Sequence, residues 1–301
     1  MIALFDSGYG GLTVLKPILK LLPEYDYLYL GDSGRAPYGN HSKENITMFS
    51  QQAVEYLFNR GVKLIIFACN TASSTALRHV QEKYLKGKDE KDRKILGVLI
   101  PAAQKAIEIT KNKRVGVVGT KATISSKVYE TEINKLDKDI KVYGKACPLL
   151  VPLIEEGWQK KPEANSILRK YLRDIKNHNV DTLILGCTHY PLMIKNFKRI
   201  LGKKIRIIES GEVTAQSLKT YLQRHPEIEK KLSKKGKREF LTTDDPTRFK
   251  DFTEKYLGMK IKMPEKINLG GNLLPLDSSR WFICNIVKYS INAIDFRKPG
   301  S

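Results

Sequence analysis

The sequence predicts an α/β fold made of two similar doubly wound parallel-sheet domains that face each other across a cleft. Three observations lead to this prediction. Short apolar runs alternate with helical stretches from the first residues onward, which is typical of parallel sheets with helical crossovers. The layout of residues 2–8 returns at residues 115–120, which indicates an internal repeat. Cys69 and Cys187 each follow a strand-like run after these segments, so we expect two thiols on opposite walls of the cleft.

The first part of the chain is expected to alternate regularly between strands and helices. Apolar runs predict strands at residues 2–5, 27–30, 64–68 and 95–100. Apolar residues at helical spacing predict helices at residues 12–22, 42–59, 71–85 and 102–109. Ser42 is the expected N-cap of the second helix. Pro101 is expected to stop the fourth strand.

The second part continues the same alternation and then departs from it. Strands are predicted at residues 115–118, 141–146, 182–185, 205–208 and, beginning one more, 239–242. Helices are predicted after Thr120 and at residues 150–156, 163–176, 191–200, 211–223 and 246–256. The pattern is irregular after residue 258. The apolar stretch 281–291 is expected to be a packed C-terminal helix, an interface element or an unusual extension.

Length and composition are those of an ordinary globular protein. The chain has 301 residues, 41% hydrophobic and 28% charged, which is enough for one large domain or two medium ones. No apolar run approaches the roughly 18–20 residues that span a bilayer. The amino terminus enters a strand without a basic segment or a cleavage site, so nothing indicates export. The four cysteines fit no zinc or disulfide spacing, and the cytoplasm, with free thiols, is the expected location.

A formal net charge of +21 raises the question of a nucleic-acid partner. The basic residues are scattered, however, and many lie beside acids. The densest cluster, residues 230–238, is flanked by Glu229 and Glu239 and is expected to be a surface linker before a strand. We therefore favour a solvated, lysine-rich surface and regard nucleic-acid binding as the less favoured interpretation.

Cys69 and Cys187 are the first candidates for chemistry. Each lies at the carboxyl end of a predicted strand and just before a helix, whose amino terminus favours a thiolate. Two such thiols form either a redox pair or a pair of acid/base groups, and the polar residues beside them favour acid/base work. Cys147 and Cys284 are expected to be small core residues.

The neighbouring residues complete a set for proton transfer. Asp6 ends the first strand, where it either poises a thiol or caps the next helix. His189 lies two residues after Cys187, where an imidazole can stabilise a thiolate or an anionic intermediate. Side-chain and backbone donors at strand ends suit a small substrate that bears carboxylates. They belong to Ser7, Asn70, Thr71, Thr120 and Thr188.

Common cofactor and phosphate motifs do not match. The segment Gly8-Tyr9-Gly10-Gly11 lacks the Lys-Ser/Thr of a nucleotide-binding loop and does not fit Gly-x-Gly-x-x-Gly. It is better explained as a tight turn that brings backbone donors near a carboxylate. No lysine motif for pyridoxal phosphate stands out, and no cluster has metal-ligand spacing, so we expect no cofactor and no metal.

At the level of motifs, the chain resembles the glutamate racemases of the cofactor-independent aspartate/glutamate racemase family. The motifs occur in the expected order over about residues 1–257, and the histidine after Cys187-Thr188 points to the glutamate branch. The matching segments are Asp6-Ser7-Gly8-Tyr9-Gly10-Gly11-Leu12-Thr13-Val14-Leu15, Gly31-Asp32-Ser33-Gly34-Arg35-Ala36-Pro37-Tyr38-Gly39, Ala68-Cys69-Asn70-Thr71-Ala72-Ser73, Val151-Pro152-Leu153-Ile154-Glu155-Glu156-Gly157, Gly186-Cys187-Thr188-His189-Tyr190-Pro191-Leu192 and Thr242-Thr243-Asp244-Asp245-Pro246.

The resemblance implies a role for each matching residue. Cys69 and Cys187 would be the catalytic acid/base thiols, with Asp6 assisting near Cys69 and His189 near Cys187. Glu155 would support His189 from behind, with its neighbour Glu156 as the alternative. The implied substrate-binding residues are Ser7, Tyr38, Gly39, Asn70, Thr71, Thr120, Thr123 and Thr188.

The resemblance also implies a domain organisation and a biological role. The first α/β domain would comprise residues 1–96 and 210–257, the second residues 97–209, and residues 258–301 would be a C-terminal extension of unclear role. The substrate would be glutamate, and its product D-glutamate would serve peptidoglycan synthesis and thus the cell wall and cell shape. A homodimer is also considered.

Three other functions stay open at this point. A hydrolase or transferase could use Cys187 with His189, but it would leave the matching Cys69-Asn70-Thr71 unexplained. A nucleic-acid-binding protein is suggested by the charge alone. An aspartate-specific racemase would share the same fold, and an assay with both amino acids would separate it.

Overall fold

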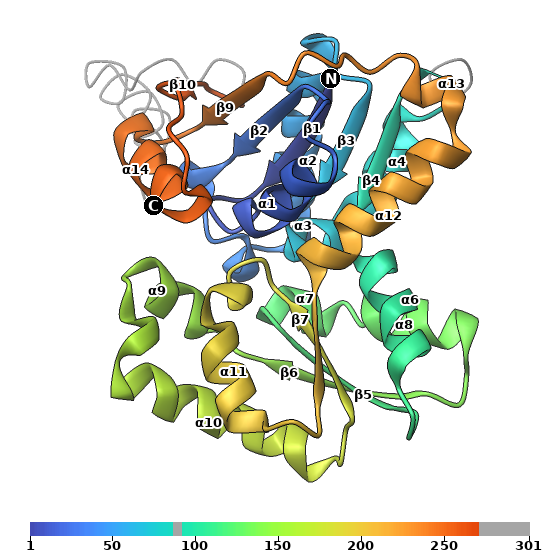
Figure 1. Cartoon of the computed structure of the whole chain (residues 1–301), viewed down its shortest axis with the longest axis vertical. Coiled ribbons are helices and arrows are strands. Elements are labelled where there is room, and N and C mark those ends of the chain that lie inside the picture. Colours follow the sequence, from blue (N-terminus) through green and yellow to red (C-terminus); the bar gives the residue numbers. More distant parts are fainter. Residues whose placement is uncertain (87–91, 271–301) are drawn as a thin grey trace, which may run out of the picture. The chain divides into compact units, whose positions relative to one another are not determined.

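The computed structural model describes residues 1–86 and 92–270. The chain divides into a compact unit, Met1–Ile267, and a second unit, Asn268–Ser301. The two sheets lie in the first unit, and Figure 1 shows helices on both faces of each. The α/β architecture predicted from the alternation of strands and helices is therefore confirmed. The apolar stretch 281–291 and Cys284 lie outside the described residues.

The first sheet contains six strands, all paired in parallel. Its order is β10-β9-β2-β1-β3-β4. Every residue of the three central strands is buried, as expected for a parallel sheet covered on both faces. The strands are β1 (Ile2–Asp6), β2 (Tyr27–Gly31), β3 (Leu64–Phe67), β4 (Lys94–Gly97), β9 (Arg238–Thr242) and β10 (Glu265–Lys266).

The second sheet contains four parallel strands in the order β6-β5-β7-β8. These are β5 (Arg114–Gly119), β6 (Lys141–Ala146), β7 (Thr182–Gly186) and β8 (Arg206–Glu209). The order β6-β5-β7-β8 repeats the order β2-β1-β3-β4 of the first sheet. The repeat seen in residues 2–8 and 115–120 thus corresponds to β1 and β5, which hold the same place in their sheets. Cys69 and Cys187 follow the equivalent strands β3 and β7.

Helices cover both sheets and form apolar cores with them. One core joins β1, β2 and β3 to α1, α12 and α14, and two more lie on the two faces of the second sheet. Helix α12 packs against both α1, which covers the first sheet, and α6, which covers the second, so it links the two sheets. The helices of the described residues are α1 (Leu12–Leu21), α2 (Lys43–Asn59), α3 (Asn70–Thr75), α4 (Leu77–Tyr84), α6 (Leu99–Ile109), α7 (Lys121–Ser125), α8 (Val128–Leu136), α9 (Leu150–Glu155), α10 (Pro162–Asn177), α11 (Ile194–Leu201), α12 (Ser210–Arg224), α13 (Pro226–Glu229) and α14 (Pro246–Leu257).

Several predicted element boundaries are confirmed and others are wrong. Ser42 is the N-cap of α2, and its Oγ accepts from the Asn45 amide at 3.3 Å. Pro101 does not stop a strand: β4 ends at Gly97, and Pro101 lies in the first turn of α6. Proline is tolerated there because the first-turn N–H groups have no partner inside the helix. The predicted irregular segment after residue 258 contains the short strand β10, which pairs with β9. The domain boundaries at residues 96/97 and 209/210 stay a prediction.

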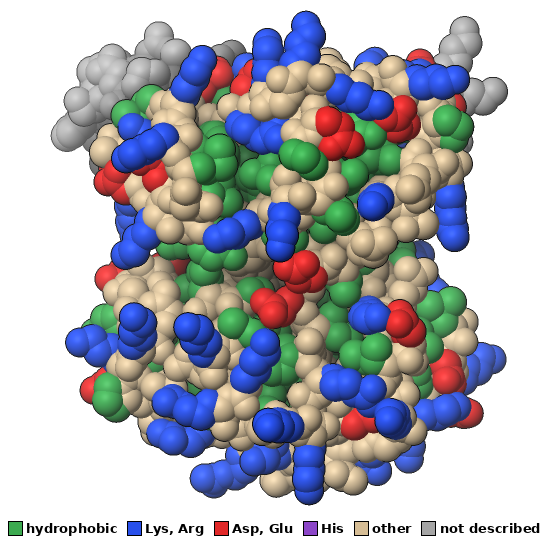
Figure 2. Space-filling view, in the orientation of Figure 1, with side chains coloured by type: hydrophobic (Ala, Val, Ile, Leu, Met, Phe, Trp, Pro, Cys, Tyr) green, Lys and Arg blue, Asp and Glu red, His purple; other side chains and the backbone are tan. Residues whose placement is uncertain are grey.

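The distribution of charged side chains bears on the question of a nucleic-acid partner. Figure 2 shows Lys and Arg side chains spread over the visible face, with Asp and Glu among them. This distribution favours a solvated basic surface, and the absence of a nucleic-acid partner stays a prediction. Among the helices of residues 1–86 and 92–270, none has the length and apolarity to cross a bilayer.

Asp181 ties together the segments that precede β5 and β7, at the amino ends of these strands in the second sheet. Its carboxylate accepts from the amides of Lys111 and Asn112 at 2.6 and 3.0 Å and from the Thr110 hydroxyl at 2.7 Å. Although partial burial opposes its charge, these donors lower the pKa of Asp181. The loop before β5 is thereby tied to the start of β7.

We expect Asp181→Ala to lower the free energy of unfolding by about 1–3 kcal/mol, because it leaves two backbone amides without their acceptor. Urea unfolding followed by circular dichroism measures this loss. Asp174→Ala is the matched control, since Asp174 pairs with Lys145 and is half exposed, and its removal should change stability by less than about 0.5 kcal/mol. Equal effects of the two substitutions would contradict the fastening role of Asp181.

Candidate functional site

The candidate site lies where the carboxyl ends of strands from both sheets meet. Asp6 ends β1, Thr120 follows β5, Cys187 follows β7, and Cys69 comes two residues after β3. These ends meet at one cavity of about 20 Å³, which is room for a water molecule. That volume is smaller than a ligand of amino-acid size. The cavity is lined by Ser7, Gly8, Ala36, Pro37, Tyr38, Gly39, Cys69, Asn70, Thr71, Thr120, Val151, Glu155, Cys187, Thr188 and His189.

Cys69 is the N-cap of α3, and its side chain is 4% exposed. Its Sγ accepts from the Ala72 amide at 3.4 Å and donates to the Ser7 Oγ at 3.5 Å. Burial, together with the nearby carboxylate of Asp6, raises the pKa of Cys69 to about 12 in spite of these two contacts. The structure therefore favours the neutral thiol at Cys69, which contradicts the expectation that the helix start would favour a thiolate there.

Cys187 faces a different set of charges. It is buried, and His189 lies beside it in the cavity wall. Glu155, at the end of α9, places Oε1 2.9 Å from Nε2 of His189. Burial opposes a charge on His189, but the interactions with Cys187 and Glu155 outweigh it and raise the pKa of His189 to about 10. An imidazolium at this position stabilises negative charge on the Cys187 sulfur.

The contact with His189 decides between the two glutamates that the sequence left open. Glu155 lies in the cavity wall, whereas Glu156 is exposed and is the C-cap of α9. Successive residues of a helix point about 100° apart, so only one of them can face the imidazole. Glu155 is thus the carboxylate behind His189.

Asp6 lies between the two thiol environments and is fully buried. Its Oδ2 accepts from the Gly8 amide at 3.0 Å, and its Oδ1 accepts from the Thr188 hydroxyl at 3.4 Å. Burial raises the pKa of Asp6, while the charge of His189 and the nearby amides act against that rise. The N-cap of α1 is Gly11, with no side-chain cap. Asp6 is absent from the residues that line the cavity, and it also accepts from the Gly11 amide at the start of α1. It acts on the site from behind, through Thr188 and through its charge beside Cys69.

The threonines and Asn70 form the polar wall of the site. Thr71 Oγ1 is 2.9 Å from Thr120 Oγ1 and 3.4 Å from Thr123 Oγ1, so hydroxyls from α3 and α7 meet. Thr123 lies behind Thr120 and is absent from the residues that line the cavity. Asn70 accepts from the Tyr129 hydroxyl at 2.7 Å, while its buried Nδ2 has no hydrogen-bond partner in the described structure. That amide is a buried donor whose hydrogen-bonding capacity is unused within the described residues.

Gly10 shows how closely the two parts of the site approach. A Cβ built on Gly10 would lie 2.3 Å from Thr188 Oγ1 and 2.5 Å from His189 Nδ1. Any side chain at this position would push Thr188 and His189 away from the cavity. The glycine turn thus gives space to the second sheet's loop, in addition to supplying backbone donors.

Sequence reasoning assigned no role to some of the residues that line the cavity. Gly8, Ala36, Pro37 and Val151 belong to quoted motifs, but no chemical feature of their side chains points to a site. Only their position in the predicted sheet could have pointed to them, because the loop after β2 emerges at the same sheet edge as Asp6 and Cys69. Within residues 1–86 and 92–270, no three His, Cys, Asp or Glu side chains gather in a way that could hold a metal ion.

The raised pKa of His189 makes folding stability depend on pH. Between the ordinary value of 6.5 and about 10, the folded protein keeps a proton that the unfolded chain has lost. The stabilisation is complete below pH 6.5 and disappears as the pH rises through about 10. The difference in unfolding free energy between wild type and His189→Gln should therefore shrink from about pH 6 to about pH 10.

Urea unfolding of both proteins at several pH values checks this expectation. His225→Gln is the matched control, because His225 forms an exposed pair with Glu227 at the same 2.9 Å distance. Solvent screens such a pair, so its contribution to stability is small at every pH. A His189 contribution that stays constant across the range would contradict the buried ion pair.

Comparison with known proteins places this geometry in context. The model of the family described as Asp/Glu/Hydantoin racemase matches residues 14–218. A glutamate racemase from Geobacter metallireducens is 39% identical over 260 residues, which are 86% of this chain and 93% of that relative.

Solved structures give the same result. A glutamate racemase isoform from Bacillus anthracis has a TM-score of 0.82 and 35% identity, covering 89% of this chain and 97% of that one. The Francisella tularensis glutamate racemase in complex with D-glutamate has a TM-score of 0.80 and 33% identity, covering 90% and 98%. The aspartate racemase of Picrophilus torridus is 21% identical with a TM-score of 0.50, which shows a shared fold alone. The strand order, the paired cysteines and these similarities lead to one conclusion: the chain belongs to the Asp/Glu/Hydantoin racemase family.

Proposed function

We propose that this protein interconverts L-glutamate and D-glutamate, with Cys69 and Cys187 as the two acid/base groups. The observation that carries the proposal is the pair of buried thiols at equivalent positions of two sheets, both lining one cavity. Inversion at Cα removes a proton from one face and returns one to the other. Two groups on opposite walls do this without moving the substrate.

The charges of the site support a specific starting arrangement. Cys69 favours the neutral thiol, and the His189 imidazolium stabilises a thiolate at Cys187. In this arrangement Cys187 removes the α-proton and Cys69 donates a proton to the opposite face. The reverse reaction requires a thiolate at Cys69, and the substrate's own ammonium group brings the positive charge that offsets Asp6 there.

The α-proton of an amino acid is far less acidic than a thiol, so the carbanion needs electrostatic support. A closed cavity excludes water and strengthens every fixed donor around the α-carboxylate. The unpartnered Nδ2 of Asn70 and the hydroxyls of Thr71, Thr120 and Thr188 are the proposed donors. Ser7, Tyr38 and Gly39 complete the substrate-binding wall in this proposal, with Thr123 supporting Thr120 from behind.

Glutamate is the proposed substrate because relatives above 30% identity over most of the chain carry that name, whereas the aspartate racemase shares the fold alone. D-Glutamate produced in this way would enter peptidoglycan synthesis. Aspartate is the competing substrate, and it is included in the assay below.

The decisive experiment incubates the purified protein with L-glutamate in D₂O, with L-aspartate in a parallel reaction. We expect D-glutamate that carries deuterium at Cα, detected by chiral separation and mass spectrometry. Cys69→Ser and Cys187→Ser should each lower the rate at least about 100-fold in both directions, because a hydroxyl is a poor base near neutral pH.

Cys147→Ala is the matched control for these two substitutions. Cys147 is a buried thiol, and its hydrogen bond with the Tyr190 hydroxyl uses the backbone carbonyl, which the substitution keeps. Its activity should stay close to wild type. Racemisation at the wild-type rate by either serine variant would contradict the two-thiol proposal. Activity confined to aspartate would mean that aspartate, and not glutamate, is the substrate.

We also propose a cytoplasmic protein, because Cys69, Cys147 and Cys187 are free thiols. The homodimer considered from the sequence stays a prediction, and light scattering coupled to size-exclusion chromatography measures it. A Cys-His hydrolase is less well supported, since it gives no role to the cavity's second thiol.

A further inference from the structure

We propose that Asp32 is a positioning residue that holds the loop 36–39 against the catalytic cavity. The inference rests on the proposed racemase function, because it assigns the loop to the substrate-binding wall. Neither Asp32 nor its ion-pair partner Arg35 lines the cavity, so both act through the loop residues that do.

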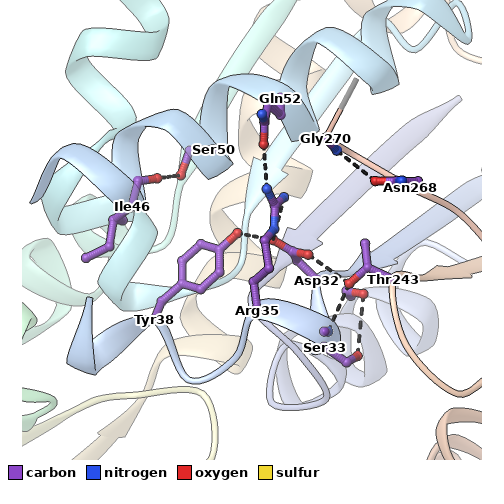
Figure 3. A network of polar contacts seen from close by, with 12 residues as sticks. Asp32, Ser33, Arg35, Tyr38, Ile46, Ser50, Gln52, Thr243, Asn268 and Gly270 are labelled. Atoms are coloured by element: carbon purple, nitrogen blue, oxygen red, sulfur yellow. Dashed lines mark hydrogen bonds and ion pairs between the residues drawn. The ribbon is translucent and has the colours of Figure 1, made fainter. Parts of the chain in front are cut away.

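Asp32 follows β2 directly and is completely buried. Its carboxylate is the centre of a network drawn in Figure 3. Arg35 approaches Oδ2 with Nε and Nη2, both at 2.8 Å, and the hydroxyl of Thr243 donates to Oδ1 at 2.8 Å. The hydroxyl of Tyr38 donates to Oδ2 as well. A buried carboxylate with this many donors is rigidly placed, since each lost bond would expose an unpaired group.

The network reaches two other elements of the fold, α2 and the end of β9. Arg35 continues to the Gln52 side chain of α2 at 2.5 Å, and its guanidinium lies 4.2 Å from the ring centre of Phe49. Thr243, just after β9, also accepts from the Gly34 amide at 2.9 Å. The segment after β2 is thereby fixed from α2 on one side and from the end of β9 on the other.

Tyr38 connects this network to the cavity, because it binds Asp32 and also lines the cavity. Burial, followed by the nearby charge of Asp32, raises its pKa well above the ordinary value, so the phenol stays protonated and donates to Asp32. Its ring packs edge-on against Phe5 of β1, next to Asp6, and against Phe49. Tyr38 and its neighbour Gly39 both line the cavity beside Cys69.

Gly39 carries the loop across to the second sheet. A Cβ on Gly39 would lie 2.7 Å from Cβ of Thr120, the residue that follows β5. The loop 36–39 is thus pressed between Asp32 behind it and the threonine wall in front. Releasing Tyr38 from Asp32 frees the loop to shift relative to both Cys69 and Thr120.

The test compares two buried tyrosines, Tyr38 after the carboxyl end of β2 and Tyr27 at its amino end. Tyr38→Phe removes the hydroxyl that binds Asp32. Tyr27→Phe is the matched control, because Tyr27 is equally buried and donates to the Leu22 carbonyl at 2.9 Å, at the amino end of β2. Both variants lose one buried hydrogen bond, so a purely structural role predicts similar losses of melting temperature and unchanged kinetics for both.

We expect Tyr38→Phe to lower kcat/KM for glutamate about 10- to 100-fold, mainly through KM, at a temperature where both variants are folded. Tyr27→Phe should keep the wild-type value. Asp32→Asn should act at least as strongly, and the double variant Asp32→Asn/Tyr38→Phe should lose less than the product of the two single losses, because both act through one hydrogen bond.

A second readout needs no racemase activity. Alkylation by iodoacetamide, mapped by mass spectrometry, reports how often the loop uncovers Cys69. Its rate at Cys69 should rise in Tyr38→Phe and Asp32→Asn but not in Tyr27→Phe. Cys147 is the internal control for general loosening, because it is fully buried in the core of the second sheet.

The outcomes separate the two proposals. Faster alkylation of Cys69 in the loop variants, without any glutamate turnover by wild type, would keep the positioning role and reject the proposed function. Normal turnover with equal kinetics and equal Cys69 alkylation in Tyr38→Phe and Tyr27→Phe would overturn the positioning role. Faster alkylation of Cys147 alongside Cys69 would overturn it too, because the loss would then be one of global stability.

Discussion

The parallel pairing of β1 with β3, and of β5 with β7, is the constraint on which the rest of the site depends. Strands that run in one direction deliver the residues that follow them to one sheet edge. Asp6 and Cys69 reach that edge in the first sheet, as Cys187 does in the second. Several contacts then join the edges: for example, the Thr13 hydroxyl donates to the Thr188 carbonyl at 2.8 Å, and Thr71 meets Thr120. The parallel pairing of the backbone thus brings the positions of the site together, whichever side chains occupy them.

Topological equivalence does not make the two thiols chemically equivalent. The residues around Cys69 include a buried carboxylate, which disfavours a second negative charge. The residues around Cys187 include an imidazole backed by Glu155, which favours one. The repeated strand order therefore supplies two matched positions, and the loops that differ surround them with opposite charges. The proposed reaction, which takes and returns a proton on opposite faces, would use both.

Much of this was accessible from the sequence, and the failures have physical reasons. Local periodicity predicted the strands and the Ser42 cap, because those depend on neighbours a few residues away. Pro101 was misread because proline ends a strand but is tolerated in the first turn of a helix. The network around Asp32 was not predicted, since its partner Thr243 is 211 residues distant and the nearby Arg35 and Tyr38 gave no sign that they share one buried carboxylate. Glu155 and Glu156 differ by a helical rotation that only the position of His189 resolves.

The size of the cavity has a consequence for the fate of the abstracted hydrogen. In the proposed reaction, a thiol that has taken a proton would have little solvent with which to exchange it, because the cavity has room for about one water molecule. The hydrogen would then stay in the site until the walls part. The fraction of solvent deuterium in the product and in the recovered substrate would then show how many proton transfers at Cα occur between two openings of the site. The rate at which the packing around Cys69 and Cys187 opens could then be measured from the isotope content alone, without a structural probe.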